Sequence, residues 1–229
     1  MPHLVDLTQT LRAGMRGVAW DTAATLEREG WNARSLHLYS HSGTHMDAQA
    51  HFAAGPETID GIPLERCMGP AWLVDIPGLA PRALITVEHL SEVQEQFQRG
   101  DSLLLRTGWS RFVDEPSIYR DGLPRIGEDL ALWCANHSVK ILGVEPPSVA
   151  DVNNLEEVTR IHKILLTAGV VIVEGLAHLE SISSRRVHFT ALPLKIDGGD
   201  GSPCRAFALE GSEARTDYPA PITVSSFSG

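Results

Sequence analysis

Residues 41–51 read HSGTHMDAQAH and contain four candidate metal ligands, His41, His45, Asp47 and His51. In an extended chain these odd-numbered side chains all point to one face. In a helical turn, His41 lies beside His45 and Asp47 lies beside His51, because each pair is four residues apart. Imidazole nitrogens and a carboxylate are ligands that hold Zn²⁺ or Mn²⁺. Either geometry therefore predicts a metal centre on this segment, with unrelated surface or core histidines as the alternative.

A helix and a strand later in the chain offer further ligands. Helical spacing of apolar residues predicts a helix over 154–167, and the β-branched run VVIVE predicts a buried strand over 170–174. His162 lies on this helix, and Glu174 ends the strand. A carboxylate at the end of a buried strand is costly unless it is paired or bound to a metal, and ligands bind at the strand ends of α/β sheets. Glu174 is therefore the stronger candidate, while a structural role for His162 is the alternative.

The order of the expected elements indicates the fold class. Helices and strands alternate between residues 86 and 174, whereas strands dominate both ends of the chain. This order favours an α/β fold with a mixed β-sheet and flanking helices over a purely parallel sheet. We expect helices over 86–98, 127–137 and 154–167, and strands over 36–40, 71–76, 102–106, 140–145, 170–174, 187–196 and 204–209.

Length and composition limit the class of protein. The 229 residues, with no long linker or repeat, predict a single compact domain over 1–229, in which the polar stretch 211–229 forms an extended C-terminal tail. A net charge of −10 without a Lys/Arg cluster argues against nucleic acid and against an anionic membrane as partners. No apolar run approaches the roughly 20 residues of a membrane span, and the first residues lack a signal-peptide layout, so we expect a cytoplasmic protein.

The three widely spaced cysteines, Cys67, Cys134 and Cys204, predict buried apolar side chains rather than disulfides or a thiolate zinc cluster.

Beyond the ligand types, the segment HSGTHMDAQAHF at 41–52 resembles a family hallmark. It is similar to the pattern HxGTHxDxPxH, followed by Phe or Tyr, of the cyclase-like metal-dependent hydrolases, which include bacterial kynurenine formamidase and isatin hydrolase. The resemblance extends over most of the chain. Further matching runs are VDLT at 5–8, RTGW at 106–109, GVEPPSV at 143–149, EG at 174–175 and ALPLKIDGGDGSPCRA at 191–206.

The resemblance implies a fold, a site and an activity. The implied fold is the swivelling β/β/α, cyclase-like domain, assembled as a homodimer or higher homo-oligomer. It implies that His41, His45 and Asp47 bind the metal, that His162 and Glu174 complete the ligand set, and that His51 is the catalytic acid/base. The implied cofactor is one or two Zn²⁺ or Mn²⁺ ions. The expected reaction is hydrolysis of a small-molecule amide, cyclic amide or imide, or lactone by metal-activated water. A polyketide-type cyclase or dehydratase and a non-catalytic metal-dependent binding protein are the alternatives.

The sequence departs from the family pattern at two positions. Gln49 replaces the hallmark proline, and Glu145 replaces an aspartate in the run at 143–149. Glutamine adds an amide donor and acceptor, so Gln49 is a candidate substrate contact, with simple tolerance of the change as the alternative. Phe52, next to His51, is the best candidate for an aromatic substrate wall. These departures favour a substrate other than that of a standard kynurenine formamidase.

Overall fold

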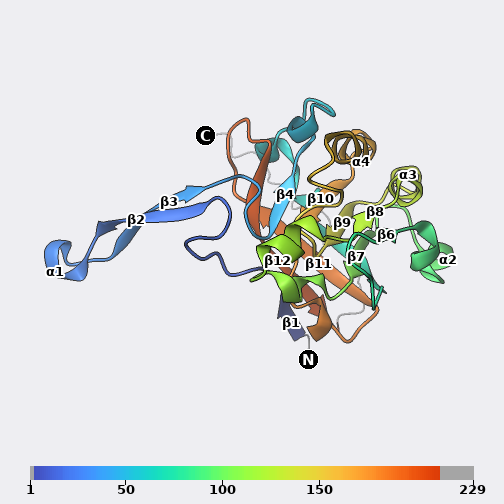
Figure 1. The fold of residues 1–229 in the computed structure, drawn as a ribbon, viewed down its shortest axis with the longest axis horizontal. Coiled ribbons are helices and arrows are strands. Elements are labelled where there is room, and N and C mark those ends of the chain that lie inside the picture. Colours follow the sequence, from blue (N-terminus) through green and yellow to red (C-terminus); the bar gives the residue numbers. More distant parts are fainter. Residues whose placement is uncertain (1–2, 212–229) are drawn as a thin grey trace, which may run out of the picture.

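One mixed sheet of eight strands dominates the computed structural model, which describes residues 3–211. Its strands are β1 (His3–Asp6), β4 (His45–Asp47), β5 (Met68–Asp75), β7 (Ser102–Arg106), β9 (Ile141–Val144), β10 (Val171–Glu174), β11 (Arg186–Pro193) and β12 (Gly201–Glu210). They lie in the order β1-β12-β11-β5-β7-β9-β10-β4 (Figure 1). The block β5-β7-β9-β10 is parallel, and every other pairing is antiparallel. Because β4 also pairs with the first residues of β12, the sheet closes into a barrel.

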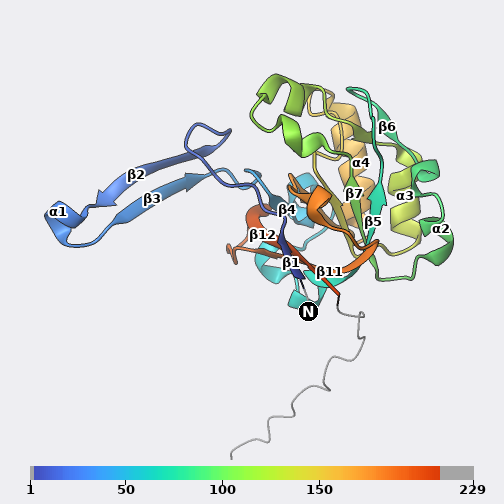
Figure 2. The ribbon, with the colours of Figure 1, turned by 90° about the horizontal axis from the view of Figure 1, so that it is seen from below.

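Alternating side chains along the strands divide the apolar core into two parts. On β5, Ala71 and Leu73 join the cluster inside the barrel, whereas Trp72 and Val74 belong to a second cluster on its outer face. This alternation follows from the two-residue repeat of a strand. The outer cluster is covered by the helices α3 (Glu128–Asn136) and α4 (Leu155–Thr167), which lie side by side against the sheet (Figures 1 and 2).

The helix α4 matches its predicted range closely. Asn154 caps its start, because the side-chain oxygen accepts a hydrogen bond from the Glu157 N–H at 3.1 Å. Three apolar side chains on its inner face pack on the outer face of the barrel: Ile161, Leu165 and Leu166. His162 is buried among them. The amphipathic repeat of this helix therefore fixes which side of it faces the sheet.

The other expected elements agree with the structure, apart from the one helix expected over 86–98. There the chain forms a 3₁₀ turn at Val87–Leu90 and a short helix α2 (Val93–Gln96). Ser91 separates them with a φ of 48°, which no α-helix accommodates. Leu90 and Val93 are both buried, so the apolar spacing that predicted one helix is satisfied by two separate turns. The prediction of a continuous helix was therefore wrong, whereas the predicted α/β class with a mixed sheet and flanking helices is confirmed.

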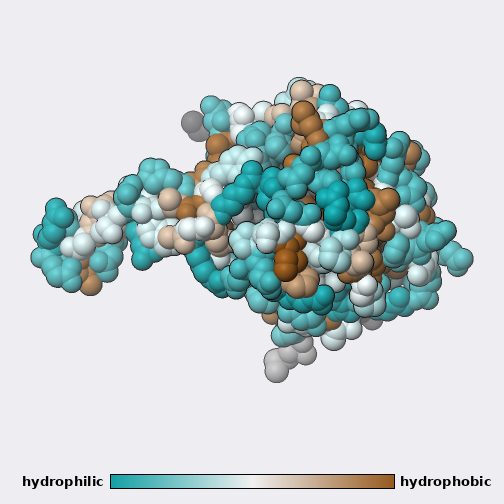
Figure 3. All heavy atoms as spheres, in the orientation of Figure 1, coloured by the Kyte–Doolittle hydropathy of each residue, from teal (hydrophilic) through white to brown (hydrophobic). Residues whose placement is uncertain are grey.

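A hairpin arm projects from the body of the molecule. It consists of β2 (Val18–Ala24), the single-turn helix α1 (Leu26–Glu29) and β3 (Ala33–Leu38) (Figures 1 and 2). Among the described residues, its two strands pair only with each other. The predicted strand at 36–40 overlaps β3 over residues 36–38, and β3 ends before the histidine segment. Leu26, Trp31 and Leu36 on the arm are each more than half exposed. Figure 3 shows a largely hydrophilic arm with apolar atoms scattered along it.

The remaining described elements are small. A second two-stranded sheet joins β6 (Leu84–Ile85) to β8 (Arg125–Ile126). The three cysteines are buried and unbonded, as the sequence predicted. Within residues 3–211, every helix is too short or too polar to cross a bilayer. The predicted C-terminal tail at 211–229 lies outside the described residues, apart from Gly211.

The barrel interior makes a direct prediction about stability. Phe189 on β11 is completely buried, so Phe189→Ala should lower the free energy of unfolding by about 3–5 kcal/mol through loss of burial and a residual cavity. Leu192 on the same strand is 38% exposed, so Leu192→Ala should cost less than about 1 kcal/mol. Urea denaturation of the two variants measures both values. Equal losses would contradict the assignment of Phe189 to the core.

Candidate metal centre

The pairing of β4 with β10 assembles the candidate site. His45 lies opposite Glu174, and Asp47 lies opposite Ile172 in the antiparallel register. Met46 and Val173, which alternate with them, belong to the barrel interior. The ionisable side chains therefore point outward from the barrel, on the face where Ile172 also lies. The helix α4 lies close to β10 on this side of the sheet (Figure 1).

Short contacts connect the carboxylates to the imidazoles around them. His45 Nε2 lies 3.1 Å from one oxygen of Glu174, and His162 Nε2 lies 3.4 Å from the other. His162 Nε2 also lies 3.6 Å from Asp47 Oδ2, and His41 Nδ1 lies 2.8 Å from Asp47 Oδ1. The structure thus brings together all five sequence-predicted ligands from three separate parts of the chain.

These residues form two groups that share one carboxylate. The first group is His41, His45 and Asp47, and the second is Asp47, His162 and Glu174. Within each group the ligand atoms lie within 4.8 Å of one another. Asp47 belongs to both groups, so its two oxygens are available to two neighbouring cations.

The chemistry of this cluster fits a divalent metal. Asp47 is 1% exposed, and its Oδ2 atom has no hydrogen-bond partner among the described residues. A buried carboxylate oxygen without a partner is costly, and a cation satisfies it. The donors are imidazole nitrogens and carboxylate oxygens, the set that Zn²⁺ and Mn²⁺ accept. The cluster is therefore a candidate metal site on geometric and electrostatic grounds.

Backbone hydrogen bonds fix the orientation of two of the imidazoles. His45 Nδ1 lies 2.9 Å from the Gly43 carbonyl oxygen, and His162 Nδ1 lies 2.7 Å from the Val158 carbonyl oxygen. A carbonyl oxygen only accepts, so each Nδ1 carries the proton. The Nε2 atom of each ring therefore faces the carboxylates, and it would become a metal ligand on losing its proton.

Asp200, which is not among the predicted site residues, orients the third imidazole. His41 Nε2 lies 2.8 Å from Asp200 Oδ2, which leaves Nδ1 toward Asp47. Gly201 permits this packing, because a Cβ atom there would lie 2.6 Å from Cε1 of His41. The available signal was a carboxylate flanked by glycines in the run GGDGSP at 198–203, directly before the first residues of β12 that pair with β4.

His51 stands at the edge of the cluster. Its ring stacks on His41 with 3.8 Å between centroids, and its Nδ1 lies 3.5 Å from Asp200 Oδ2. Burial lowers its pKa from the ordinary value for histidine, and the positive charge of His41 adds to this effect. At neutral pH His51 is therefore a neutral base beside the candidate ligands.

The carboxylates have the opposite effect on His41. Burial alone would lower the pKa of His41, but the hydrogen bonds and charges of Asp47 and Asp200 outweigh burial and raise it to about 9. Burial would likewise raise the pKa of Asp47, but His41 and its neighbours hold it well below the usual range. The metal-free cluster therefore holds protons where a metal would bind.

The two candidate substrate contacts differ in their surroundings. Phe52 stacks on His162 with 4.3 Å between ring centroids and lines the cavity beside the cluster. The Gln49 amide instead donates to the Leu166 carbonyl oxygen at the end of α4 and accepts from the Glu57 N–H. Gln49 thus ties the 3₁₀ turn Gln49–Phe52 to α4, with its amide engaged outside the cavity.

Glu145, the second departure from the family pattern, is buried in a cradle of donors. Its carboxylate accepts hydrogen bonds from the backbone N–H groups of Thr107, Gly108 and Trp109 and from the Ser110 hydroxyl. These partners lie in the turn that follows β7. Glu145 therefore stabilises the backbone of this turn, and the neighbouring cavities are lined by other residues.

Two adjoining cavities give access to the cluster. The smaller, of about 180 Å³, is lined by His41, His45, His51, His162 and Glu174. The larger, of about 360 Å³, extends outward from His41 and His45. A small molecule of the size of a substituted aromatic ring fits this combined space.

Comparisons with known proteins agree with the fold and the residue pattern. Residues 5–151 match the model of the family described as "Putative cyclase". A kynurenine formamidase from Salinibacter ruber is 32% identical, over 82% of this chain and 84% of that protein. A second kynurenine formamidase, from Erythrobacter litoralis, is also 32% identical, over 90% of this chain and 93% of that protein.

Solved structures share the architecture. Isatin hydrolase A from Labrenzia aggregata superimposes with a TM-score of 0.82 at 22% identity, covering 91% of this chain and 93% of that one. A predicted metal-dependent hydrolase from Bacillus stearothermophilus has a TM-score of 0.75 at 25% identity, covering 92% of this chain and 100% of that one. The chain therefore belongs to the cyclase family, as its motifs predicted, and the predicted enzyme class, hydrolase, is confirmed by its relatives.

The protonation of the cluster predicts how metal binding depends on pH. Since the pKa of His41 is about 9 without metal, an ion must displace its proton at neutral pH. Between pH 6.5 and 8.5 the apparent association constant for Zn²⁺ should therefore rise about tenfold per pH unit from this group alone. Calorimetric titrations in buffers of different protonation enthalpy count the released protons. A Zn²⁺ affinity that stays constant over this pH range, without proton release, would contradict the assignment of His41 as a protonated ligand.

Proposed function

We propose that this protein is a metal-dependent hydrolase that cleaves the C–N bond of a small amide or cyclic amide. The observation that carries the proposal is the pair of candidate ligand groups sharing Asp47, directly beside the neutral base His51. One buried oxygen of Asp47 has no hydrogen-bond partner within residues 3–211. In the reaction, the oxygen of water bonds to the carbonyl carbon and the C–N bond breaks. The products are a carboxylic acid and an amine.

We assign the metal ligands to His41, His45 and Asp47 for one ion, and to Asp47, His162 and Glu174 for a second. The ligand types support Zn²⁺ or Mn²⁺, with one or two ions bound. When bound, a divalent ion activates water and polarises the carbonyl oxygen of the substrate. The backbone contacts of His45 and His162 hold these ligands in place before any ion arrives.

His51 is assigned to proton transfer. Its lowered pKa keeps the ring neutral, so it can accept a proton from the attacking water. Asp200, 3.5 Å from Nδ1, favours the proton on that nitrogen and leaves Nε2 to exchange a proton with the substrate. The imidazolium then delivers its proton to the nitrogen of the leaving amine.

The chemical class of the substrate follows from the relatives and the cavity. Two relatives that align over most of this chain are kynurenine formamidases, which supports an amide, and in particular an arylformamide. Phe52 beside His51 provides an aromatic wall for such a ring. Cyclic amides, imides and lactones are further candidates, because their reacting group is also a carbonyl. The presence of His51 in the cavity weighs against a non-catalytic binding protein.

A pair of variants separates metal binding from proton transfer. His51→Ala should keep its metal but lower kcat for an arylformamide about 10²–10⁴-fold, because only the acid/base is removed. Asp47→Ala should lose both metal and activity, since Asp47 belongs to both ligand groups. Elemental analysis and steady-state kinetics on the purified proteins measure both effects.

The controls for this pair are simple. Asp21 lies on the arm, so Asp21→Ala should leave metal content and turnover unchanged. Full metal occupancy in Asp47→Ala would refute the ligand assignment. Loss of metal in His51→Ala would move His51 from the acid/base role to the ligand set.

We further propose that the chain assembles as a homodimer or higher homo-oligomer through its hairpin arm. The arm exposes Leu26, Trp31 and Leu36 and pairs with no other strand within residues 3–211, and burial of these side chains would stabilise an assembly. Trp31→Asp should therefore shift the mass measured by light scattering toward the monomer. An unchanged mass in this variant would exclude this use of Trp31, and a monomeric wild-type protein would exclude the assembly itself.

A further inference from the structure

Two arginines stand where the cavity over the metal cluster meets the larger cavity. From their position we infer that Arg16 and Arg120 bind a carboxylate group of the substrate while its amide occupies the metal cluster. The inference rests on the proposed amide hydrolysis and narrows it to substrates that carry an anionic group. A neutral lactam or formamide lacks the partner that these two guanidinium groups select.

The two cavities beside the metal cluster have several lining residues in common, including both arginines. Arg16, Arg120, His41, His45 and Pro147 line both the cavity of about 180 Å³ and the cavity of about 360 Å³. A molecule that reaches the metal cluster through the larger cavity therefore passes both arginines. Since these arginines and the histidines His41 and His45 border the same space, one small substrate can contact both sets.

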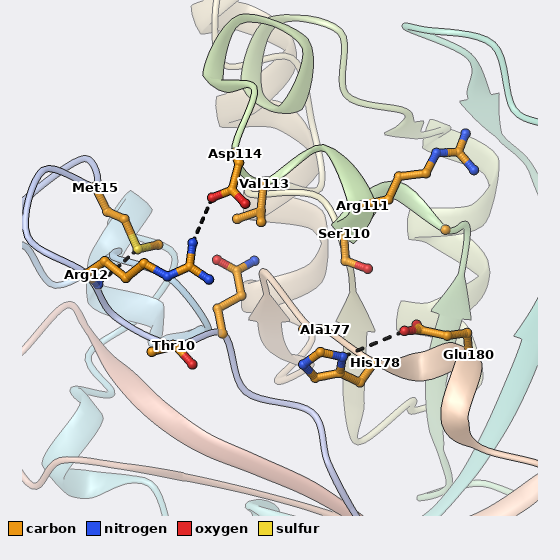
Figure 4. A pocket seen from close by; sticks show the side chains of 12 residues that line it. Thr10, Arg12, Met15, Ser110, Arg111, Val113, Asp114, Ala177, His178 and Glu180 are labelled. Carbon is orange, nitrogen blue, oxygen red and sulfur yellow. Dashed lines mark hydrogen bonds and ion pairs between the residues drawn. The ribbon is translucent and has the colours of Figure 1, made fainter.

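The charge around this junction is positive, although the whole chain carries −10. Outside the metal cluster, the charged residues that line the two cavities are Arg12, Arg16, Arg120 and Asp114. Arg12 Nη1 lies 2.9 Å from Asp114 Oδ1, so these two charges cancel. Figure 4 shows this pair on the wall that borders a neighbouring cavity, with the two side chains pointing toward each other. Arg120 is paired with Asp121, which lies outside the lining of both cavities, so Arg16 is the cation of this lining that has no ion pair within residues 3–211.

Both arginines have donors to spare. The structure gives the Arg16 guanidinium no hydrogen bond or ion pair within residues 3–211, and its recorded contact is with the Tyr39 ring at 5.5 Å. Arg120 uses Nη1 for Asp121 and Asn153, at 2.8 and 3.1 Å. These two bonds hold the Arg120 side chain from one end and leave its Nη2 and Nε donors for a ligand.

The loop that carries Arg16 is attached to the metal-binding segment. The Ser42 hydroxyl, next to His41, lies 3.2 Å from the Arg16 carbonyl oxygen and 3.3 Å from that of Gly17. Gly17 has a φ of 71°, and a side chain there would collide with Tyr39 and Ser42. The backbone of Arg16 is thus held at a fixed place relative to His41.

A carboxylate is the group that this junction suits. Its two oxygens match the planar fork of a guanidinium, and such charge-assisted hydrogen bonds are about twice as strong as neutral ones. An amide substrate that extends outward from the metal cluster would place a ring substituent at the junction. The arginines would therefore contribute to substrate binding, whereas bond cleavage stays with the metal cluster and His51.

Formanilide and its ortho-, meta- and para-carboxylates test this inference on the metal-loaded enzyme. At least one carboxylate should be hydrolysed with a higher kcat/KM than neutral formanilide. In Arg16→Gln, kcat/KM for that carboxylate should fall at least about tenfold, mainly through KM, while the value for formanilide stays within about twofold. Arg16→Lys should retain part of the preference, because it keeps the charge but loses the fork.

Arg111→Gln is the matched control for a change in overall charge. Arg111 lies near the junction but lines neither of the two cavities, so its variant should keep the preference. A wild-type enzyme that hydrolyses formanilide and its carboxylates equally well, with no effect of Arg16→Gln, would overturn the inference and leave the proposed hydrolase intact.

Binding supplies a readout that does not depend on turnover. If none of the four formanilides were hydrolysed, the proposed function would fail for arylformamides, and calorimetric binding of the three aminobenzoates and of aniline would still decide the subsite. We expect the tightest aminobenzoate to bind the wild-type protein more tightly than aniline does, and to weaken at least about tenfold in Arg16→Gln. Aminobenzoate binding that requires the metal but is unchanged in Arg16→Gln would assign the carboxylate to the metal instead and refute the arginine subsite.

Discussion

The burial of two carboxylates among three imidazoles, at the seam where the barrel closes, is the constraint on which the rest of the structure depends. β4 is only three residues long, yet it pairs with β10 on one side and β12 on the other. The same three residues therefore complete the barrel and present His45 and Asp47 to the outside. A helix must then cover this polar patch, and α4 does so with His162 on its inner face. The hydrogen bonds that β4 makes with β10 and β12 therefore both close the barrel and position the candidate ligands.

Much of this arrangement was predictable because its signals are local. Spacing within residues 41–51 predicted the first ligands, and a charged residue at the end of an apolar strand predicted Glu174. The contact of Asp200 with His41 joins residues 159 positions apart, and no local pattern reports such a distance. The helix expected over 86–98 failed for a related reason, since periodicity records which side chains are buried but not the left-handed φ of Ser91 that interrupts the helix. The projection of the arm from the body could not be predicted either. Alternation of apolar and polar residues predicts that a strand forms, but not which surface that strand packs on.

The two departures from the family pattern are resolved by their hydrogen bonds. Gln49 stands where the family hallmark has a proline, and its amide connects the turn after the ligands to the Leu166 carbonyl oxygen near the end of α4 and to the Glu57 N–H. Glu145 fills a cradle of backbone donors beside the cavity wall. Both changes act on the scaffold that supports the site. Differences in substrate choice are better sought at the cavity junction, where the sequence shows no motif and where Arg16, in the loop before β2, and Arg120, in the helical turn Ser117–Asp121, line the same space.

The double membership of Asp47 has a thermodynamic consequence. Its carboxylate is a donor to both ligand groups, so neither position is an independent binding site. An ion held by one group draws charge from the oxygen that the other group must use, yet it also fixes the orientation of the shared side chain. By linkage, whatever factor the first ion applies to the affinity of the second, the second applies to the first. If both groups bind an ion, as we propose, the two positions would load as one coupled unit.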